Sequence, residues 1–136
     1  MVYSKNSFDE NCYTLIKDKL IKSKGFSELR LIDLKIRDHS LIPRLLSDLK
    51  LDMRLSTLSL SKLKLDNMAA KILGEFISNN PYCLKNLDIS WNHFSCQATS
   101  DLLKTFYGNE ELKFLNVSHN RVTMTDQLKE FGLFVR

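Results

Sequence analysis

Four polar residues in the second half of the chain are of the types that nucleophilic catalysis uses: Asp88, Ser90, Ser118 and His119. A serine nucleophile needs a histidine base within hydrogen-bond reach and a third group that orients the base, inside a pocket that excludes water. Serines are also the residues that exposed strands carry by default, and no feature of the sequence predicts a deep cleft. We therefore predict that the protein is not an enzyme.

His93 and Cys96 lie three residues apart and could in principle be two ligands of a metal ion. A structural zinc site needs a second pair of ligands, and no second pair with such spacing exists. The chain has only four glycines and no Gly-rich loop for a phosphate. We expect no cofactor and no metal. The net charge of +4 leaves nucleic-acid binding as a weak alternative.

The cysteines Cys12, Cys83 and Cys96 are odd in number and scattered, which argues against a disulfide framework and for a reducing compartment. No apolar run approaches the roughly 18–20 residues that cross a bilayer. The N-terminus lacks the basic and then apolar pattern of a secretory signal. We expect an intracellular, cytoplasmic protein that is not secreted.

Apolar residues recur in a pattern that would position all of these side chains. The template L-x-x-L-x-L-x-x-N-x-L fits from residues 26, 55, 84 and 112, at intervals of 29, 29 and 28 residues. All sixteen apolar positions of the template are filled, which has a chance probability on the order of one in a million for a fixed register. The Asn position of the template reads Leu34, Leu63, Asn92 and Asn120.

On segments 84–94 and 112–122 above all, the chain resembles the leucine-rich repeat family, and its period is similar to that of the ribonuclease-inhibitor-like subtype. The resemblance implies an α/β fold, a leucine-rich repeat solenoid in a short horseshoe arc, with a parallel β-sheet on the concave face and α-helices on the convex face. We expect residues 1–25 to form an N-terminal helical cap and residues 26–136 to form the four repeats.

Capping residues mark where each helix is expected to begin. Ser40 precedes a predicted helix through Leu49, Asp66 or Asn67 caps the next, and Ser95 caps the third. Thr123 with Asp126 resembles a capping box for a fourth helix. Residues 8–23 are also expected to be helical.

Side chains at template positions 2, 3, 5, 7 and 8 are expected to point outward and to form columns across strands about 4.8 Å apart. The first two strands carry small polar residues there, whereas the last two carry large ones. Trp91 is the only tryptophan of the chain, and tryptophan is enriched at binding hot spots; packing against its own loop is the alternative. The predicted partner-binding residues are Trp91, Phe114, His119, Lys85, Lys113, Asp88 and Asn116.

The last six residues are rich in apolar side chains, so the C-terminal edge of the sheet is expected either to dock a protein partner or to be covered by the folded-back segment. The predicted function is that of a non-catalytic protein–protein interaction module, as a small structural subunit of an intracellular assembly. The resemblance makes a ciliary or cytoskeletal assembly plausible. The alternatives are a regulator or inhibitor that binds an enzyme or a GTPase, and a weak nucleic-acid binder.

Overall fold

The computed structural model describes residues 2–4, 7–22, 27–49, 55–79, 84–107 and 109–120. Strands and helices alternate through most of these ranges. In chain order they are β1 (Val2–Ser4), β2 (Ser7–Phe8), α1 (Glu10–Lys22), β3 (Glu28–Ile32), β4 (Lys35–Ile36), α2 (Leu41–Leu49), β5 (Thr57–Ser59), α3 (Asn67–Asn79), β6 (Asn86–Asp88), α4 (Cys96–Lys104) and β7 (Phe114–Asn116).

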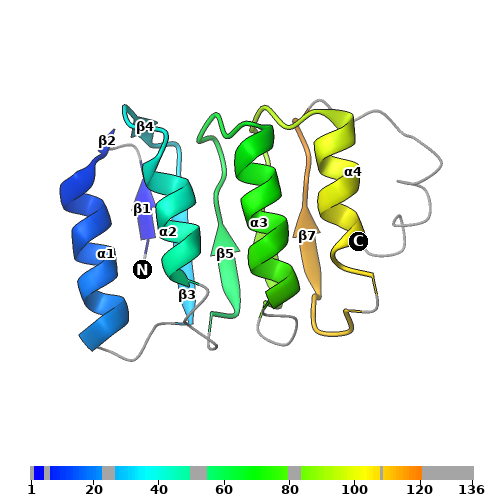
Figure 1. The fold of residues 1–136 in the computed structure, drawn as a ribbon, viewed down its shortest axis with the longest axis horizontal. Coiled ribbons are helices and arrows are strands. Elements are labelled where there is room, and N and C mark those ends of the chain that lie inside the picture. The colour runs from blue at the N-terminus through cyan, green and yellow to red at the C-terminus, as the bar shows by residue number, and fades with distance from the viewer. Residues whose placement is uncertain are drawn as a thin grey trace.

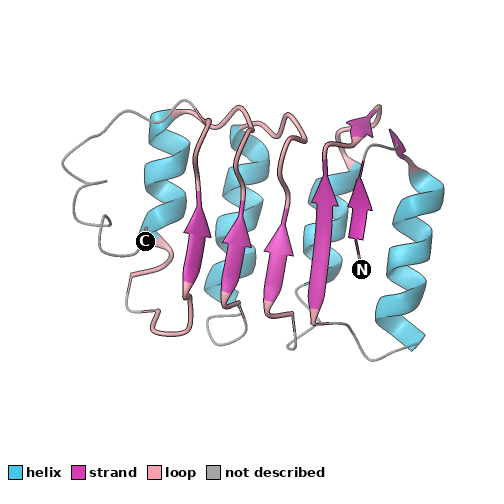
Figure 2. Cartoon of the chain, turned by 180° about the vertical axis from the view of Figure 1, so that it is seen from behind, coloured by secondary structure: helices cyan, strands magenta, loops and turns pink. Residues whose placement is uncertain are grey.

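Two parallel sheets organise the described residues. One has five strands in the order β1-β3-β5-β6-β7, and the other pairs β2 with β4. Figure 1 shows the four helices side by side in front of the larger sheet. Seen from behind in Figure 2, the strands of this sheet carry no helix. The fold therefore has two layers, and one face of its main sheet is open.

Alternation along the strands explains why the sheet is covered on one face only. Successive side chains of a strand point to opposite faces. Leu29 and Leu31 are fully buried toward the helices, while Arg30 between them is half-buried on the other face. Strand pairing aligns Leu29 with Leu58 and Leu58 with Leu87, so that one apolar row crosses the sheet.

Side chains at the ends of helices fix where several helices begin. The Asp66 carboxylate accepts a hydrogen bond from the Ala69 N–H at 3.1 Å, and the Ser95 hydroxyl accepts one from the Ala98 N–H at 3.1 Å, as predicted. Asp9 does the same for Cys12 at 3.0 Å. Ser40 precedes α2 as expected, but its hydroxyl donates to the Asp38 carboxylate at 2.6 Å and does not cap the helix.

The predicted leucine-rich repeat solenoid is wrong as the fold class, because the chain forms a small α/β domain with two parallel sheets. The template located the strands β3, β5, β6 and β7 correctly. However, an apolar template reports only that each strand buries one face against a helix, which any sheet covered on one side requires. It is silent on β1 and β2, which precede α1 in a segment where no strand was predicted and which pair with β3 and β4.

A polar cluster joins α1 to α2 at the outer face of the helical layer. The Tyr13 hydroxyl donates a hydrogen bond to the Asp48 carboxylate, and Lys17 lies 3.9 Å from the same carboxylate. The Arg44 guanidinium stacks 4.5 Å from the centre of the Tyr13 ring and bonds both carboxylate oxygens of Glu10, at 3.1 and 3.2 Å. This cluster raises the pKa of Tyr13 above 10.0, because the phenol donates to Asp48, is buried, and faces a negative charge.

The raised pKa of Tyr13 makes a contribution to stability that depends on pH. Ionisation is harder in the folded state, so the contribution is fully present below about pH 10 and is lost as the pH rises through the folded-state pKa. We expect urea unfolding of the wild type to show a larger loss of stability between about pH 8 and about pH 11 than unfolding of Tyr13→Phe, which has no phenol to titrate. Equal losses in the two proteins would contradict this assignment.

Candidate protein-binding surface

Four turns at the carboxyl edge of the main sheet share an unusual backbone conformation. Asp33, Lys62, Trp91 and His119 follow successive strands, and their φ angles are 56°, 57°, 56° and 56°. Hydrogen bonds between the turns hold this conformation: the N–H of Lys62 donates to Ser90 O at 3.1 Å, and the N–H of Trp91 donates to Ser118 O at 3.0 Å. The side chains of these four residues therefore stand in a row along one edge.

Three side chains of this row contact one another, and we call Lys62, Trp91 and His119 the turn stack. The rings of Trp91 and His119 are stacked, with centroids 3.7 Å apart and planes at 13°. The Lys62 ammonium lies 5.6 Å from the Trp91 ring centroid, within the range of a cation–π interaction. Trp91 nevertheless remains 51% exposed. The alternative in which Trp91 packs only against its own loop does not hold.

Buried hydrogen bonds of Asn92 join the turns that carry Lys62 and Trp91. The Asn92 side chain is 3% exposed, and its oxygen accepts hydrogen bonds from the N–H groups of Leu63 and Leu65 at 3.1 and 3.0 Å. Its amide nitrogen donates to Leu60 O at 2.7 Å and Ile89 O at 3.0 Å. Asn92 thus ties the third turn to the second, as predicted from the template. Asn120 bonds the backbone in the same way, its oxygen accepting from the Phe94 N–H at 3.2 Å and its nitrogen donating to Ile89 O at 2.9 Å.

At the equivalent template position of the first two turns, Leu34 and Leu63 are buried, at 6% and 1% exposure. This was expected where the sequence has leucine in place of asparagine. The third and fourth turns therefore carry a hydrogen-bonding asparagine at this position, and the first two carry a buried leucine.

The open face of the sheet carries a shallow hollow of about 390 Å³. The Ser59 hydroxyl at its floor is buried and has no hydrogen-bond partner among the described residues. Glu28 and Arg30 form an ion pair beside it, and the hydrogen bond from Arg30 lowers the pKa of the Glu28 carboxyl. The hollow is lined by Arg30, Thr57, Leu58, Ser59, Asn86, Asp88 and Phe114.

The predicted partner-binding residues do not form one patch. Trp91 and His119 meet in the turn stack, while Asp88 and Phe114 line the hollow, where Phe114 is 44% exposed. The remaining three lie in or next to the last two strands: Asn116 ends β7 and is half-buried, and Lys85 and Lys113 are exposed just before β6 and β7, at the opposite edge of the sheet from the turns.

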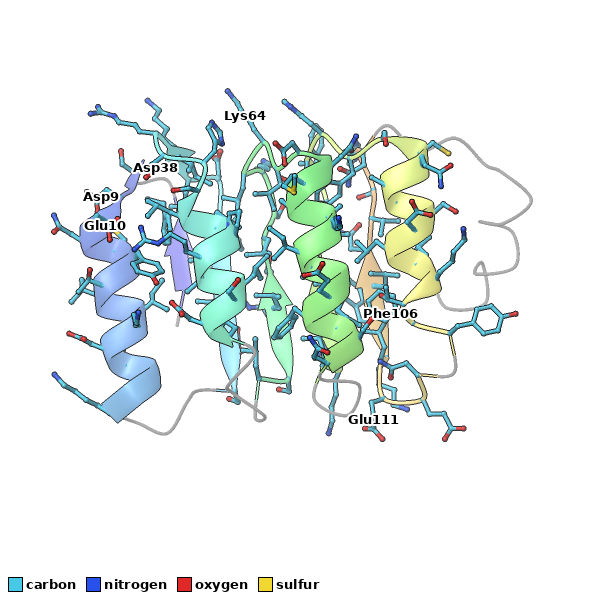
Figure 3. All side chains as sticks on the ribbon, viewed as in Figure 1. Asp9, Glu10, Asp38, Lys64, Phe106 and Glu111 are labelled. Carbon is cyan, nitrogen blue, oxygen red and sulfur yellow. The ribbon has the colours of Figure 1, made fainter. Side chains whose placement is uncertain are left out.

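Figure 3 shows the two edges through labelled residues, with Lys64 projecting at the turn edge and Glu111 at the other. Residues that the prediction left out complete the surface at both places. Lys62 belongs to the turn stack, and Arg30 and Ser59 belong to the hollow. Lys62 stands at template position 8, as Trp91 does, but only its contact with the Trp91 ring in the structure indicates that it belongs to the surface.

Template position 7 carries Ser61, Ser90 and Ser118, and two of these serines are less accessible than an outward-pointing column predicts. Ser61 and Ser90 are buried, and their hydroxyls lie 3.1 Å apart in a hydrogen bond. Ser118 donates to the Asn116 side chain at 2.7 Å, and the ring of His119 is stacked on Trp91. Ser61, Ser90 and Ser118 therefore bond groups other than His119.

Two further properties concern the described part of the chain. It contains no group of three or more His, Cys, Asp or Glu side chains that could hold a metal ion. None of its helices is both long and apolar enough to cross a membrane. The predicted open C-terminal edge, with the apolar residues near position 131 and beyond, lies outside the described residues.

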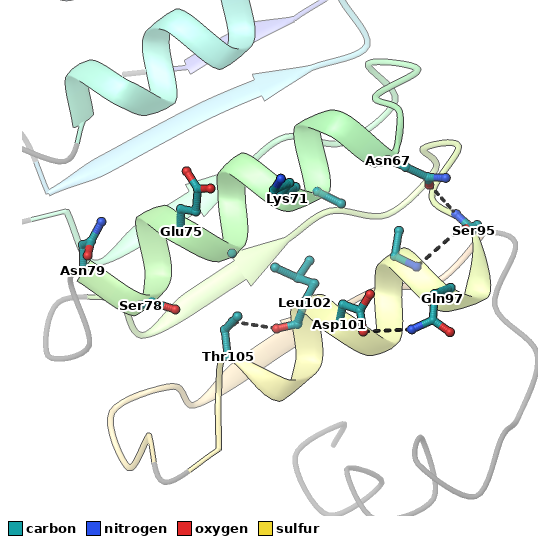
Figure 4. A pocket seen from close by; sticks show the side chains of 13 residues that line it. Asn67, Lys71, Glu75, Ser78, Asn79, Ser95, Gln97, Asp101, Leu102 and Thr105 are labelled. Carbon is teal, nitrogen blue, oxygen red and sulfur yellow. Dashed lines mark hydrogen bonds between the residues drawn. The ribbon is translucent and has the colours of Figure 1, made fainter.

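A second hollow, of about 670 Å³, lies between α3 and α4 on the helical side (Figure 4). Gly74 allows the two helices to approach here, since a Cβ atom on it would lie 3.3 Å from Thr105 Cγ2. Asn67 accepts a hydrogen bond from the Ser95 N–H at 2.9 Å, and Gln97 donates to Asp101 at 2.9 Å, so several of the lining polar groups already bond within the chain. This hollow is a less suitable binding site than the open face with its exposed aromatic rings.

Comparison with solved structures supplies the fold's relatives. The chain is similar to the leiomodin-1 actin-binding site 2, with a TM-score of 0.74 and 12% identity over 94% of this chain and 73% of that one. It is also similar to the C-terminal domain of tropomodulin from Caenorhabditis elegans, with a TM-score of 0.74 and 16% identity over 88% and 71% of the two chains. No family model and no curated protein sequence matches the chain.

These likenesses define the fold as that of the tropomodulin and leiomodin C-terminal domains. They correct the predicted membership of the leucine-rich repeat family, and with it the description of the chain as a solenoid. At such low identity the likeness establishes the fold alone.

Proposed function

We propose that this chain is a non-catalytic protein-binding domain of the actin cytoskeleton, a small structural subunit that attaches a larger intracellular assembly to actin. The observation that carries the proposal is the likeness of its fold to the actin-binding site 2 of leiomodin-1. The names of the fold's relatives offer no support for a cilium.

The open sheet face and the turn edge next to it support protein binding. Protein interfaces concentrate their energy in a few exposed aromatic and cationic side chains near the centre of the contact. Trp91 and Phe114 are large and exposed; Trp91 lies in the turn after β6 and Phe114 lies on β7, the last strand of the described sheet. The hollow beside Phe114 is too shallow and open to exclude water from a reaction, but it can accept a side chain of a partner.

Sedimentation with actin filaments and gel filtration with monomeric actin test the proposal. We expect the wild type to bind one of these forms, and the double variant Trp91→Ala, Phe114→Ala to bind at least about tenfold more weakly, because hot-spot residues contribute about 2 kcal/mol or more each. Both side chains are exposed, so the variant is expected to fold.

The matched control is the double variant Leu15→Ala, Met68→Ala. It removes two hydrophobic side chains that are 57% and 61% exposed on helices α1 and α3, and its binding should equal that of the wild type. If the wild type binds neither filaments nor monomers, the proposed function is wrong. If both double variants bind as the wild type does, actin binding stands and the site must lie elsewhere.

A further inference from the structure

The turn stack keeps large side chains where the backbone favours glycine. A non-glycine residue with φ near 56° is strained, and only glycine adopts this conformation freely. Such strain persists where surrounding bonds enforce it, and it gathers at binding sites. Here the turn-to-turn hydrogen bonds enforce it at Lys62 and Trp91. The strained residues include the single tryptophan and two cationic side chains, Lys62 and Lys64, with φ of 57° and 55°.

Two lysines place positive charge at this edge. Lys62 and Lys64 are both exposed, and neither forms an ion pair with any residue that the structure describes. Two of the carboxylates near them are held by the backbone: Asp66 accepts the Ala69 N–H at 3.1 Å, and Asp88 accepts the Ser90 N–H at 3.0 Å. Asp33, in the turn next to that of Lys62, is an exposed carboxylate that forms no ion pair with Lys62. The ammonium groups therefore remain available to an anionic partner.

The rings are arranged to contact a peptide side chain and not to stack on a nucleotide base. A base needs a free aromatic face. The turns of Lys62 and His119 flank the turn of Trp91 in the order of the strands, so the ammonium and the imidazole lie over the two faces of the indole. Trp91 still remains 51% exposed, so an apolar side chain can cover its exposed surface while neighbouring carboxylates reach the lysines.

We propose that the turn stack, together with Lys64, is a recognition site for an acidic segment of a protein partner that also carries apolar side chains. This deepens the proposed function, on which it rests, by assigning the chemistry of the partner's contact. Lys62 and Lys64 pair with carboxylates of this segment, and the exposed surface of Trp91 packs against an apolar side chain that lies between those carboxylates.

The single tryptophan allows a direct test in the intact chain. A short synthetic peptide of aspartate, glutamate and leucine should change the Trp91 fluorescence saturably. The same peptide with asparagine and glutamine in place of the acids should bind roughly tenfold more weakly, because the complementary charges are gone. The variant Lys62→Gln, Lys64→Gln should lose affinity for the acidic peptide to a similar degree. Lys71→Gln, which removes an exposed lysine from α3, should leave it unchanged.

Several results would overturn the inference: no response to the acidic peptide, equal affinity for the amide peptide, or a fluorescence response to an oligouridylate instead. Calorimetry on Trp91→Gly gives a second measurement. This variant keeps the turn, since glycine accepts its φ, so its urea midpoint should stay close to that of the wild type while peptide binding is lost. Unchanged binding by this variant would also exclude the site.

The two proposals can fail separately. If the acidic peptide binds at the turn stack but actin does not bind, the partner is another acidic protein and only the proposed function is wrong. If actin binds but the peptide does not, the proposed function stands and the inference about the turn stack is wrong.

Discussion

Replacing Asn92 with alanine is expected to lower the free energy of unfolding by about 3–5 kcal/mol, since each buried donor or acceptor left without a partner costs about 1–3 kcal/mol. The substitution leaves the N–H groups of Leu63 and Leu65 and the carbonyl of Leu60 without the hydrogen bonds that Asn92 makes to them. Water cannot replace the amide easily, because the side chain is 3% exposed. Urea unfolding followed by circular dichroism measures the loss.

Asn120→Ala is the matched control, because Asn120 makes the same kind of bonds at a half-buried position. Its oxygen accepts from the Phe94 N–H at 3.2 Å, and solvent can reach the site. We expect a loss of about 1–2 kcal/mol there. Asn92→Leu adds a second check: although leucine fills the equivalent position in two other turns, it should destabilise this one nearly as much as alanine. A loss below about 1 kcal/mol for Asn92→Ala would show that the network does not hold the turns.

Phe94→Ala is expected to cost about 3–5 kcal/mol, the usual range for truncating a fully buried phenylalanine. Phe94 is 0% exposed and follows the third turn directly, where its N–H bonds Asn120. The loss combines the transfer of the ring out of the core with the cavity left behind. Because a domain of this kind has a total stability of only about 5–15 kcal/mol, the variant should unfold at a markedly lower urea concentration.

Phe114→Ala makes the comparison informative, because it deletes the same ring from a side chain that is 44% exposed. A cost below about 1 kcal/mol is expected for a substitution at such a position. We therefore expect Phe94 to be needed for folding, and Phe114 to contribute to binding and little to stability. If Phe114→Ala destabilised the chain as much as Phe94→Ala, Phe114 would be a core residue and its place on the proposed binding surface would be lost.

Much of the local structure could be predicted because it depends on short-range chemistry. Ser95 caps α4 through a bond to the Ala98 N–H three residues further on, whatever the rest of the fold does. Asn92 was predictable because the template places an asparagine there, although its bonds reach Leu60 in the neighbouring turn. The fold class could not be predicted in this way. A repeated apolar pattern specifies the strands and the buried face of each, while the overall relation of the sheets depends on segments outside the pattern. Strands β1 and β2 lie before the first match to the template, which starts at residue 26, so the repeat did not mark them.

The prediction included Trp91, His119, Phe114 and Asp88 of the candidate surface but left out Lys62, Arg30 and Ser59. Trp91 and Phe114 stood out by type and by their positions on the strands, and both are exposed. The left-handed turns were not visible in the sequence, because Asp33, Lys62, Trp91 and His119 share no residue type that favours this conformation strongly. Lys85 and Lys113 were grouped with Trp91 because all three occupy variable template positions, although position 2 precedes the strand and position 8 follows it.

The strand pairing described above also bears on how the chain folds. Each strand of the main sheet pairs only with the strands of that sheet that come just before and just after it in the chain. Leu29 is aligned with Leu58 in this way, and Leu58 with Leu87. No pairing in the described sheet requires distant parts of the chain to meet first, so the loops to be closed are all of similar, moderate length. Such a topology has a low contact order for a parallel sheet and favours rapid folding that spreads from one unit to the next.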